Sequence, residues 1–259
     1  MIHKSKKSLG QNFLKSSMAL RKIIEAGEVS NNDTILEIGP GKGVLTEKLL
    51  EKAKVVIAVE KDRELFAILQ NKFAEQIKSG SLVLIHDDIL NFNIESYQQA
   101  SYKLIANIPY NITGAILKKF LTAQSQPERM ILMVQLEVAR RIVASDSKES
   151  ILSISVKAYG KPKIVCKVPA RYFSPSPKVD SAVIVIYGIS KNLFTRSNLV
   201  GGERINEEKF WEIVKAGFSH KRKKLGGNLK NLCLKEDLKL FADKRAENLT
   251  LLDWISLAR

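Results

Sequence analysis

The fold is decided by residues 34–43, whose sequence is Thr-Ile-Leu-Glu-Ile-Gly-Pro-Gly-Lys-Gly, followed by a helical pattern over residues 44–53. An apolar run and then glycines at alternate positions predict a strand, a tight turn and a helix. Glycine permits a positive φ and lets a ligand approach the backbone closely. A glycine loop on its own is weak evidence for a ligand, because a tight strand-to-helix turn needs glycine as well.

Further apolar runs and helical patterns alternate on the C-terminal side of this turn. We expect strands at 54–59, 82–85, 103–106 and 130–134, and helices at 65–77, 113–121 and 137–144. Nearly continuous apolar strands that alternate with helices predict an α/β fold with a parallel sheet covered on both faces.

Two later apolar runs, 164–168 and 181–187, predict a hairpin at the edge of that sheet, whereas residues 151–158 fit a strand or a helix. Residues 193–204 are polar and contain glycine, and only helical patterns follow them. We therefore place a domain boundary near residue 190, which gives an α/β domain over 1–190 and a small helical domain over 191–259.

Composition excludes several classes of protein. A chain of 259 residues with 45% hydrophobic and 27% charged residues is an ordinary globular composition rather than a disordered one. No apolar run reaches the roughly 18 residues of a membrane span, and no apolar segment of a signal peptide follows the basic N-terminus. Cys166 and Cys233 lack metal-ligand spacing, and the three histidines are scattered. We expect a cytoplasmic protein without a metal site or membrane attachment.

The positive charge is concentrated in three stretches. The net charge is +15, and residues 1–24, 157–178 and 215–230 each contain six basic residues and no acid. A solvated lysine face explains any one of these stretches, but three together favour a polyanionic partner, of which nucleic acid is the commonest. Among them, we expect Lys221, Arg222, Lys223 and Lys224 to contact the phosphates of a nucleic acid, because this run has no acidic neighbour in the sequence.

The glycine turn is not typical of a dinucleotide or triphosphate site. Val44 stands where the dinucleotide fingerprint needs a third, small residue, and the Gly-Lys-Ser/Thr of a Walker loop is absent. The remaining candidate is a cofactor without a pyrophosphate, S-adenosylmethionine. Glu60 ends the next strand and could accept hydrogen bonds from both ribose hydroxyls. Asp88 ends the third strand and could accept a hydrogen bond from the adenine amine of the cofactor. Asp87 is the alternative residue for that role.

The most specific motif is Asn107-Ile108-Pro109-Tyr110, at the end of the fourth predicted strand. The exocyclic amine of a base is a poor nucleophile, because its lone pair is delocalised into the ring. The Asn107 amide and the carbonyl of residue 108 are acceptors that can hold both N–H groups and localise that lone pair. Tyr110 offers a ring on which a flipped base can stack. A proline-containing turn with a core tyrosine is the alternative explanation.

These motifs together resemble the ribosomal RNA adenine dimethyltransferase family. The matching segments are residues 8–14, 37–43, 107–110, 173–181, 218–224 and 245–249, together with Glu60 and Asp88. The resemblance implies a Rossmann-like S-adenosylmethionine-dependent methyltransferase domain with a small all-helical C-terminal domain. It also implies dimethylation of adenine N6 in ribosomal RNA. The tail segments are more similar to the small-subunit branch, which modifies two adjacent adenines in a 3′-terminal hairpin loop.

The resemblance also assigns roles to individual residues. The predicted cofactor-binding residues are Gln11, Asn12, Leu14, Gly39, Gly41, Glu60, Asp88 and Asn107, and the residues that would frame the target base are Asn107, Tyr110 and Phe173. We expect Phe173 to be exposed, since Pro175 and Pro177 keep its loop extended. The expected partner is ribosomal RNA or a small-subunit precursor, and the expected assembly is a monomer.

Rival functions remain at this point. One is a non-catalytic RNA-binding assembly factor, against which the intact Asn107–Tyr110 motif argues. Another is the large-subunit, antibiotic-resistance branch of the same family. A DNA adenine methyltransferase usually has proline as the second residue of the motif, where this chain has Ile108. A nicotinamide oxidoreductase is disfavoured by Val44.

Overall fold

The computed structural model of the chain describes residues 5–6, 9–97, 101–144, 146–195, 205–220, 222–233 and 235–259. The chain divides into two units, of which the first comprises residues 1–139 and 161–189 and the second residues 140–160 and 190–259. One division falls beside the boundary that we predicted near residue 190. The grouping of residues 140–160 with the second unit has no counterpart in the sequence pattern.

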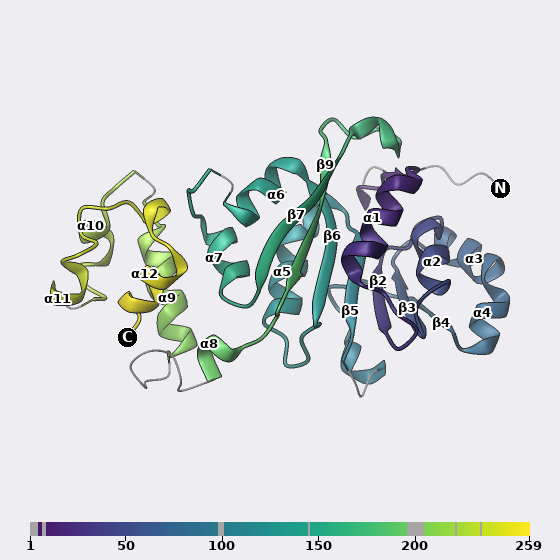
Figure 1. Cartoon of the computed structure of the whole chain (residues 1–259), viewed down its shortest axis with the longest axis horizontal. Coiled ribbons are helices and arrows are strands. Elements are labelled where there is room, and N and C mark those ends of the chain that lie inside the picture. The colour runs from purple at the N-terminus through teal and green to yellow at the C-terminus, as the bar shows by residue number, and fades with distance from the viewer. Residues whose placement is uncertain are drawn as a thin grey trace. The chain divides into compact units, whose positions relative to one another are not determined.

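The first unit is built on a seven-stranded sheet (Figure 1). In spatial order the strands are β4 (Leu82–His86), β3 (Val55–Glu60), β2 (Thr34–Ile38), β5 (Lys103–Asn107), β6 (Arg129–Gln135), β9 (Ser181–Tyr187) and β7 (Lys161–Val168). The strands from β4 to β6 are parallel, and β9 is antiparallel to both β6 and β7. The predicted parallel sheet with a hairpin at its edge is therefore confirmed.

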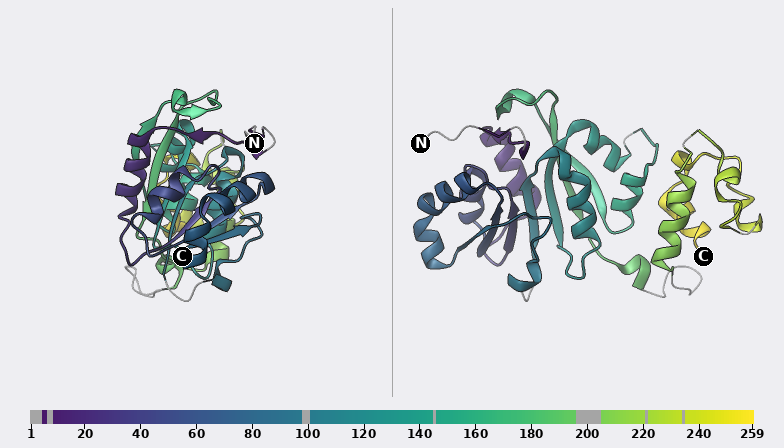
Figure 2. Two further views of the ribbon diagram at one scale, coloured as in Figure 1. Left: turned by 90° about the vertical axis from the view of Figure 1, so that its right-hand side faces the viewer. Right: turned by 180° about the vertical axis from the view of Figure 1, so that it is seen from behind.

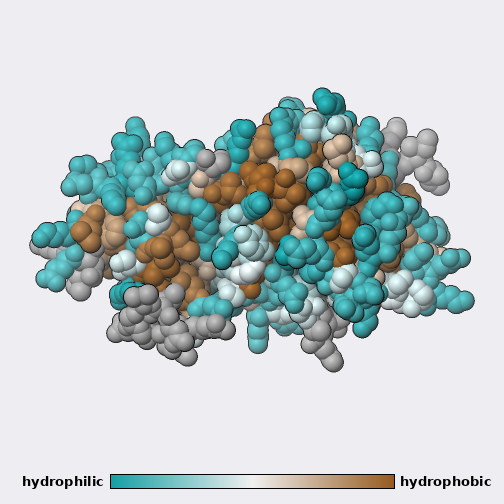
Figure 3. Space-filling view, in the orientation of Figure 1, coloured by the Kyte–Doolittle hydropathy of each residue, from teal (hydrophilic) through white to brown (hydrophobic). Residues whose placement is uncertain are grey.

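Helices cover both faces of this sheet, as the apolar strands require. They are α1 (Ser17–Gly27), α2 (Val44–Leu50), α3 (Arg63–Lys72), α4 (Ala74–Ser79), α5 (Thr113–Leu121) and α6 (Leu136–Val143). Helix α1 lies in front of the strands in Figure 1, whereas α5 lies in front of them in the view from behind (Figure 2). Hydrophilic side chains cover the surface over α3 and α4 (Figure 3).

The predicted helix over residues 65–77 is two helices in the structure. Asp62 caps α3 by accepting a hydrogen bond from the Glu64 amide, and the helix ends at Phe73, where φ is −114°. Phe73 is buried in the core of the unit. A periodicity pattern continues across such a break because α4 begins at the next residue.

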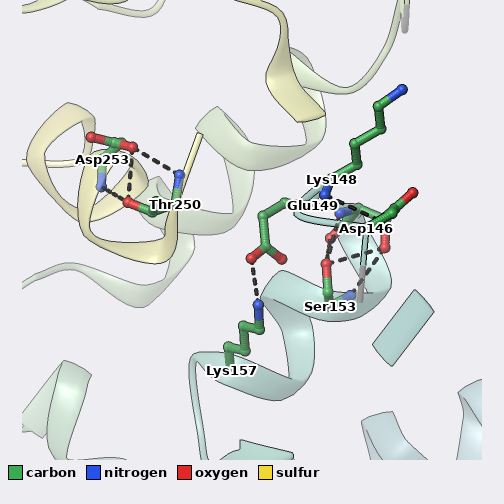
Figure 4. Close-up of polar contacts among 8 residues, drawn as sticks. Asp146, Lys148, Glu149, Ser153, Lys157, Thr250 and Asp253 are labelled. Carbon is green, nitrogen blue, oxygen red and sulfur yellow. Dashed lines mark hydrogen bonds and ion pairs between the residues drawn. The ribbon is translucent and has the colours of Figure 1, made fainter. Parts of the chain in front are cut away.

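The second unit consists of short helices. They are α7 (Ile151–Lys157), α8 (Asn192–Thr195), α9 (Glu207–Gly217), α10 (Leu225–Leu229), α11 (Lys235–Leu238) and α12 (Leu251–Leu257). The structure makes residues 151–157 a helix because Ser150 and Ser153 form a capping box at its start. Thr250 and Asp253 cap α12 in the same way, and Figure 4 shows this box together with the Lys157–Glu149 ion pair near α7.

The core of the second unit forms around Trp254, which is fully buried and stacks on Phe218 at 5.4 Å between ring centroids. Apolar side chains also reach the surface over α9 and α12 (Figure 3), and Leu252 of α12 is 73% exposed. Within the described part of the chain, no helix combines the length and the apolar character that crossing a membrane requires.

Candidate active site

A cavity of about 140 Å³ lies at the carboxyl ends of the parallel strands in the first unit. This is the edge at which open α/β sheets bind ligands. Its walls come from the ends of β2, β3 and β5, from the loop after β4, and from a segment before α1, residues 9–14, which we call the N-terminal strap. The strap includes the two-residue strand β1 (Phe13–Leu14).

The glycine turn forms one wall of the cavity. Its glycines adopt positive φ angles, which residues with a side chain disfavour. Gly39, Gly41 and Gly43 have φ values of 62°, 62° and 73°. A Cβ atom on Gly43 would lie 2.5 Å from the ring of Phe73, and one on Gly41 would lie 3.1 Å from the ring of Phe13. These glycines therefore serve the close packing of the turn as well as leaving its backbone open to a ligand.

Glu60 braces this turn at the end of β3. Its carboxylate accepts hydrogen bonds from the Gly41 amide at 3.0 Å and from the Asp62 amide at 2.8 Å. Burial raises the pKa of Glu60, and the backbone N–H groups oppose the rise. Each carboxylate oxygen retains a second lone pair, so the predicted hydrogen bonds to ribose hydroxyls remain geometrically possible.

Glu37, at the end of β2, also lines the cavity, and the motif analysis gave it no role of its own. Its side chain is buried, and within the described residues its Oε2 atom has no hydrogen-bond partner. Burial raises the pKa of Glu37 to about 8, with the nearby Glu60 carboxylate adding to the rise and the Thr46 hydroxyl opposing it. A buried carboxyl with an unpartnered oxygen beside a cavity fits a ligand that brings a donor or a positive charge.

Asp87 and Asp88 both line the cavity at the end of β4. Asp88 pairs through Oδ2 with Lys61 at 2.7 Å, and its Oδ1 accepts from the Leu90 amide at 3.0 Å. The Lys61 ammonium group holds the pKa of Asp88 below its usual value. Asp87 accepts a hydrogen bond from the Asp88 amide. The structure thus brings both acids to the cavity, and the assignment of Asp88 to the adenine amine stays a prediction.

The Asn107–Tyr110 motif follows β5 and forms the opposite wall. The side chain of Asn107 donates from Nδ2 to the carbonyl oxygen of Asn12 at 3.1 Å. This bond directs the amide nitrogen toward the strap, so the Oδ1 atom remains available as an acceptor. Tyr110 begins a 3-10 turn (Tyr110–Ile112) and shares a hydrogen bond of 2.6 Å with the hydroxyl of Ser181.

The N-terminal strap is tied to the rest of the unit through Gln11. Its Oε1 accepts from the Lys6 amide at 2.8 Å, and its Nε2 donates to Asp62 at 2.8 Å. Lys6 also pairs with Asp62 at 2.9 Å, and these hydrogen bonds help to lower the pKa of Asp62 against the effect of burial. Gln11, Asn12 and Leu14 all line the cavity, although Leu14 is also part of the core, and their binding of a cofactor stays a prediction.

The expectation of an exposed Phe173 is wrong. Its side chain is 2% exposed and belongs to the hydrophobic core. The cause is a pairing that the sequence does not indicate: β8 (Phe173–Ser174) is antiparallel to β1 of the strap, with Leu14 opposite Phe173. To frame a base, Phe173 would have to leave this core, and its role there stays a prediction.

The predicted RNA-binding run lies in the second unit. Lys221 lies outside the described residues, whereas Arg222, Lys223 and Lys224 are exposed. The expectation that this run has no acidic partner is wrong for Lys224, which pairs with Asp243 at 2.8 Å. Both of these side chains are largely exposed, so the pair contributes little stability. Across the residues that the structure describes, no group of three or more potential ligands is arranged to hold a metal ion.

The parallel sheet with its antiparallel edge hairpin, and the cavity at its carboxyl edge, define a Rossmann-like methyltransferase fold. A dimethyladenosine transferase from Plasmodium falciparum has a similar structure, with a TM-score of 0.78 and 26% identity over 95% of each chain. The 23S rRNA methyltransferase ErmE shares the fold, with a TM-score of 0.76, 24% identity, and coverage of 95% of this chain and 98% of that one.

Sequence comparisons identify the family to which the chain belongs. The family model for ribosomal RNA adenine dimethylase matches residues 2–258, and the chain belongs to that family. It is similar to ribosomal RNA small subunit methyltransferase A of Dehalococcoides mccartyi, with 39% identity over 98% of this chain and 87% of the relative. The protein of the same name from Fusobacterium nucleatum is 36% identical over 100% of this chain and 98% of the relative. The family expected from the motifs is confirmed.

Proposed function

We propose that the protein transfers methyl groups from S-adenosylmethionine to N6 of two adjacent adenines in the 3′-terminal hairpin loop of small-subunit ribosomal RNA. The observation that carries this proposal is the orientation of Asn107, whose Nδ2 donates to the strap at 3.1 Å. Membership of the family and the names of the relatives support the choice of substrate. The protein would act in the cytoplasm on ribosomal RNA or an assembling small subunit.

The cavity fits S-adenosylmethionine by the chemistry of its walls. Glu37 presents a buried carboxyl whose Oε2 atom has no hydrogen-bond partner in the described part of the chain, which suits the cofactor's ammonium group. Glu60 retains acceptor capacity for the ribose, and we assign the adenine amine to Asp88, which lines the same cavity. Gly39 and Gly41 expose the backbone of the turn at two positions that line the cavity. The cofactor would supply a methyl group on a sulfonium, from which a neutral thioether leaves.

The protein's own residues would make the adenine amine reactive. In the first transfer, Oδ1 of Asn107 and the carbonyl oxygen of Ile108 accept hydrogen bonds from the two N–H groups, which localises the nitrogen lone pair for attack on the methyl carbon. In the second transfer, one of these acceptors holds the single N–H that is left. The same acceptors stabilise the positive charge that the nitrogen acquires. That charge makes the N–H protons acidic, so one of them passes to water without a dedicated base. The Tyr110 ring supplies the stacking surface that holds the adenine in line.

The proposal is tested with the purified protein and small subunits isolated from a strain that lacks this modification. After incubation with S-adenosylmethionine, mass spectrometry of the ribosomal RNA should detect dimethyladenosine at two adjacent positions near the 3′ end. Binding to the subunits without methylation would instead indicate a non-catalytic assembly factor. Methylation of large-subunit RNA alone would indicate the antibiotic-resistance branch.

A further inference from the structure

The hydroxyl group of Ser181 lies in the interior of the first unit. Ser181 is fully buried at the first position of β9, where it is opposite Gln135 of β6 and Val168 of β7. A buried hydroxyl group is costly unless it finds a hydrogen-bond partner. Its partner is the phenol of Tyr110, at 2.6 Å between the two oxygens.

The backbone around Ser181 is fixed without any contribution from Tyr110. The carbonyl of Asp180 accepts a hydrogen bond from the Leu136 amide at 2.9 Å, and the Asp180 carboxylate accepts one from the Ala170 amide at 2.9 Å. Strand pairing holds Ser181 from both sides. The serine is therefore the rigid member of the pair, and the tyrosine is the member that is held.

Local hydrogen bonds hold the backbone of Tyr110 in place. Its carbonyl accepts the Thr113 hydroxyl at 3.1 Å and the Thr113 amide, so the turn that it begins is held at the main chain. The ring can still rotate about its side-chain torsions, and it lines the cavity. A hydrogen bond at the phenol, the end farthest from the backbone, fixes the direction in which the ring extends into the cavity.

We infer that Ser181 is a positioning residue, whose hydroxyl fixes the direction of the Tyr110 side chain and so the location of the ring on which the target adenine stacks. This inference rests on the proposed function. Small displacements of a reacting group lower the rate of transfer strongly, so a Tyr110 side chain that can move away from this position would slow the chemical step. RNA docking elsewhere on the protein would be unaffected.

The first test uses Ser181→Ala, Tyr110→Phe and the double variant in a methyl-transfer assay with the small-subunit substrate. We expect each single variant to lower kcat about tenfold, with KM for the RNA within about twofold of wild type. The double variant should be no slower than the slower single variant, because all three lose the same hydrogen bond. Ser181→Thr restores the hydroxyl and should recover most of the activity.

Ser153→Ala is the matched control, because it also removes a fully buried serine hydroxyl but in the second unit. It should leave kcat unchanged at a temperature at which the variant is folded. If Ser181→Ala fails to fold, Tyr110→Phe removes the same bond from the other partner and keeps the inference open to refutation.

A second test measures stacking directly with a short RNA hairpin in which 2-aminopurine replaces a target adenine. Its fluorescence should be quenched when wild-type protein binds and less quenched with Ser181→Ala, although both proteins bind the hairpin equally. A merely structural serine would change thermal stability without changing this signal. Unchanged quenching, or a kcat for Ser181→Ala within about twofold of wild type, would overturn the positioning role. Wild-type protein that transfers no methyl groups would instead contradict the proposed function.

Discussion

The buried carboxyl group of Glu37 makes the stability of the protein depend on pH. Its pKa is raised to about 8, from an ordinary value of 4.5, chiefly by burial. Between these two values the native state retains a proton that the unfolded state has lost, so stability falls as pH rises. Glu37→Gln removes this linkage, and its stability relative to wild type should increase from about pH 5 to pH 8, with a maximal slope of about 1.4 kcal/mol per pH unit.

Urea unfolding of both proteins across that range measures the difference, because groups distant from Glu37 titrate alike in the two chains. If the free energies of unfolding of the two proteins change with pH in parallel, Glu37 is ionised in the native state. The same variant should bind S-adenosylmethionine more weakly if the carboxylate faces the cofactor's ammonium group.

Glu60 combines a binding role with a structural one. Glu60→Ala removes the predicted ribose acceptor and should weaken cofactor binding by about 1.5–3 kcal/mol, measured by calorimetry. The variant should also lose stability, because the amides of Gly41 and Asp62 lose their partner. Glu47→Ala, which removes an exposed carboxylate from α2, is the control. Cofactor affinity equal to that of wild type would contradict the ribose assignment.

The variant Asn107→Ala tests whether Asn107 takes part in methyl transfer. Loss of one transition-state acceptor should lower single-turnover methyl transfer by about 10²–10³-fold, by analogy with oxyanion-hole donors. Cofactor affinity should stay closer to wild type, because the other walls of the cavity are unchanged. Rapid-quench measurements with saturating RNA separate the two effects. Transfer that survives within a few-fold would make Asn107 a turn residue only.

At the scale of elements, the pairing of β1 with β8 decides what Phe173 does. Phe173→Leu keeps most of the apolar volume, so we expect a loss of stability of about 1–1.5 kcal/mol. If the side chain stays in the core during catalysis, methyl transfer should remain within about threefold of wild type. A much larger loss of transfer at unchanged stability would show that Phe173 leaves the core and stacks on the base.

At the scale of the whole molecule, the charged run of the second unit is expected to bind RNA. Replacing Lys221, Arg222, Lys223 and Lys224 by Ala should weaken RNA binding and leave cofactor affinity intact. If all four contact a duplex, the slope of log affinity against log salt should become shallower by about 3–4 units. The control variant replaces four exposed lysines of the first unit, Lys48, Lys52, Lys54 and Lys78, which changes the net charge equally. Equal effects of the two variants would indicate non-specific attraction.

The sequence alone determined the elements of the sheet and the position of the cavity. Strands buried on both faces are nearly continuous apolar runs, and the turn after β2 needs glycines, so both are visible locally. The carboxyl ends of parallel strands lie at one edge, which brings residues as distant as Glu60 and Asn107 to one site. A family match over residues 2–258 agrees with that local pattern.

Only the tertiary structure decided which distant side chains form hydrogen bonds and pack together. The bond from Asn107 to the strap joins residues 95 positions apart, and the bond from Tyr110 to Ser181 joins residues 71 positions apart. The burial of Phe173 depends on a strand pairing with residues 13–14. Periodicity and composition report on neighbours along the chain, whereas these contacts exist only once distant segments have packed together.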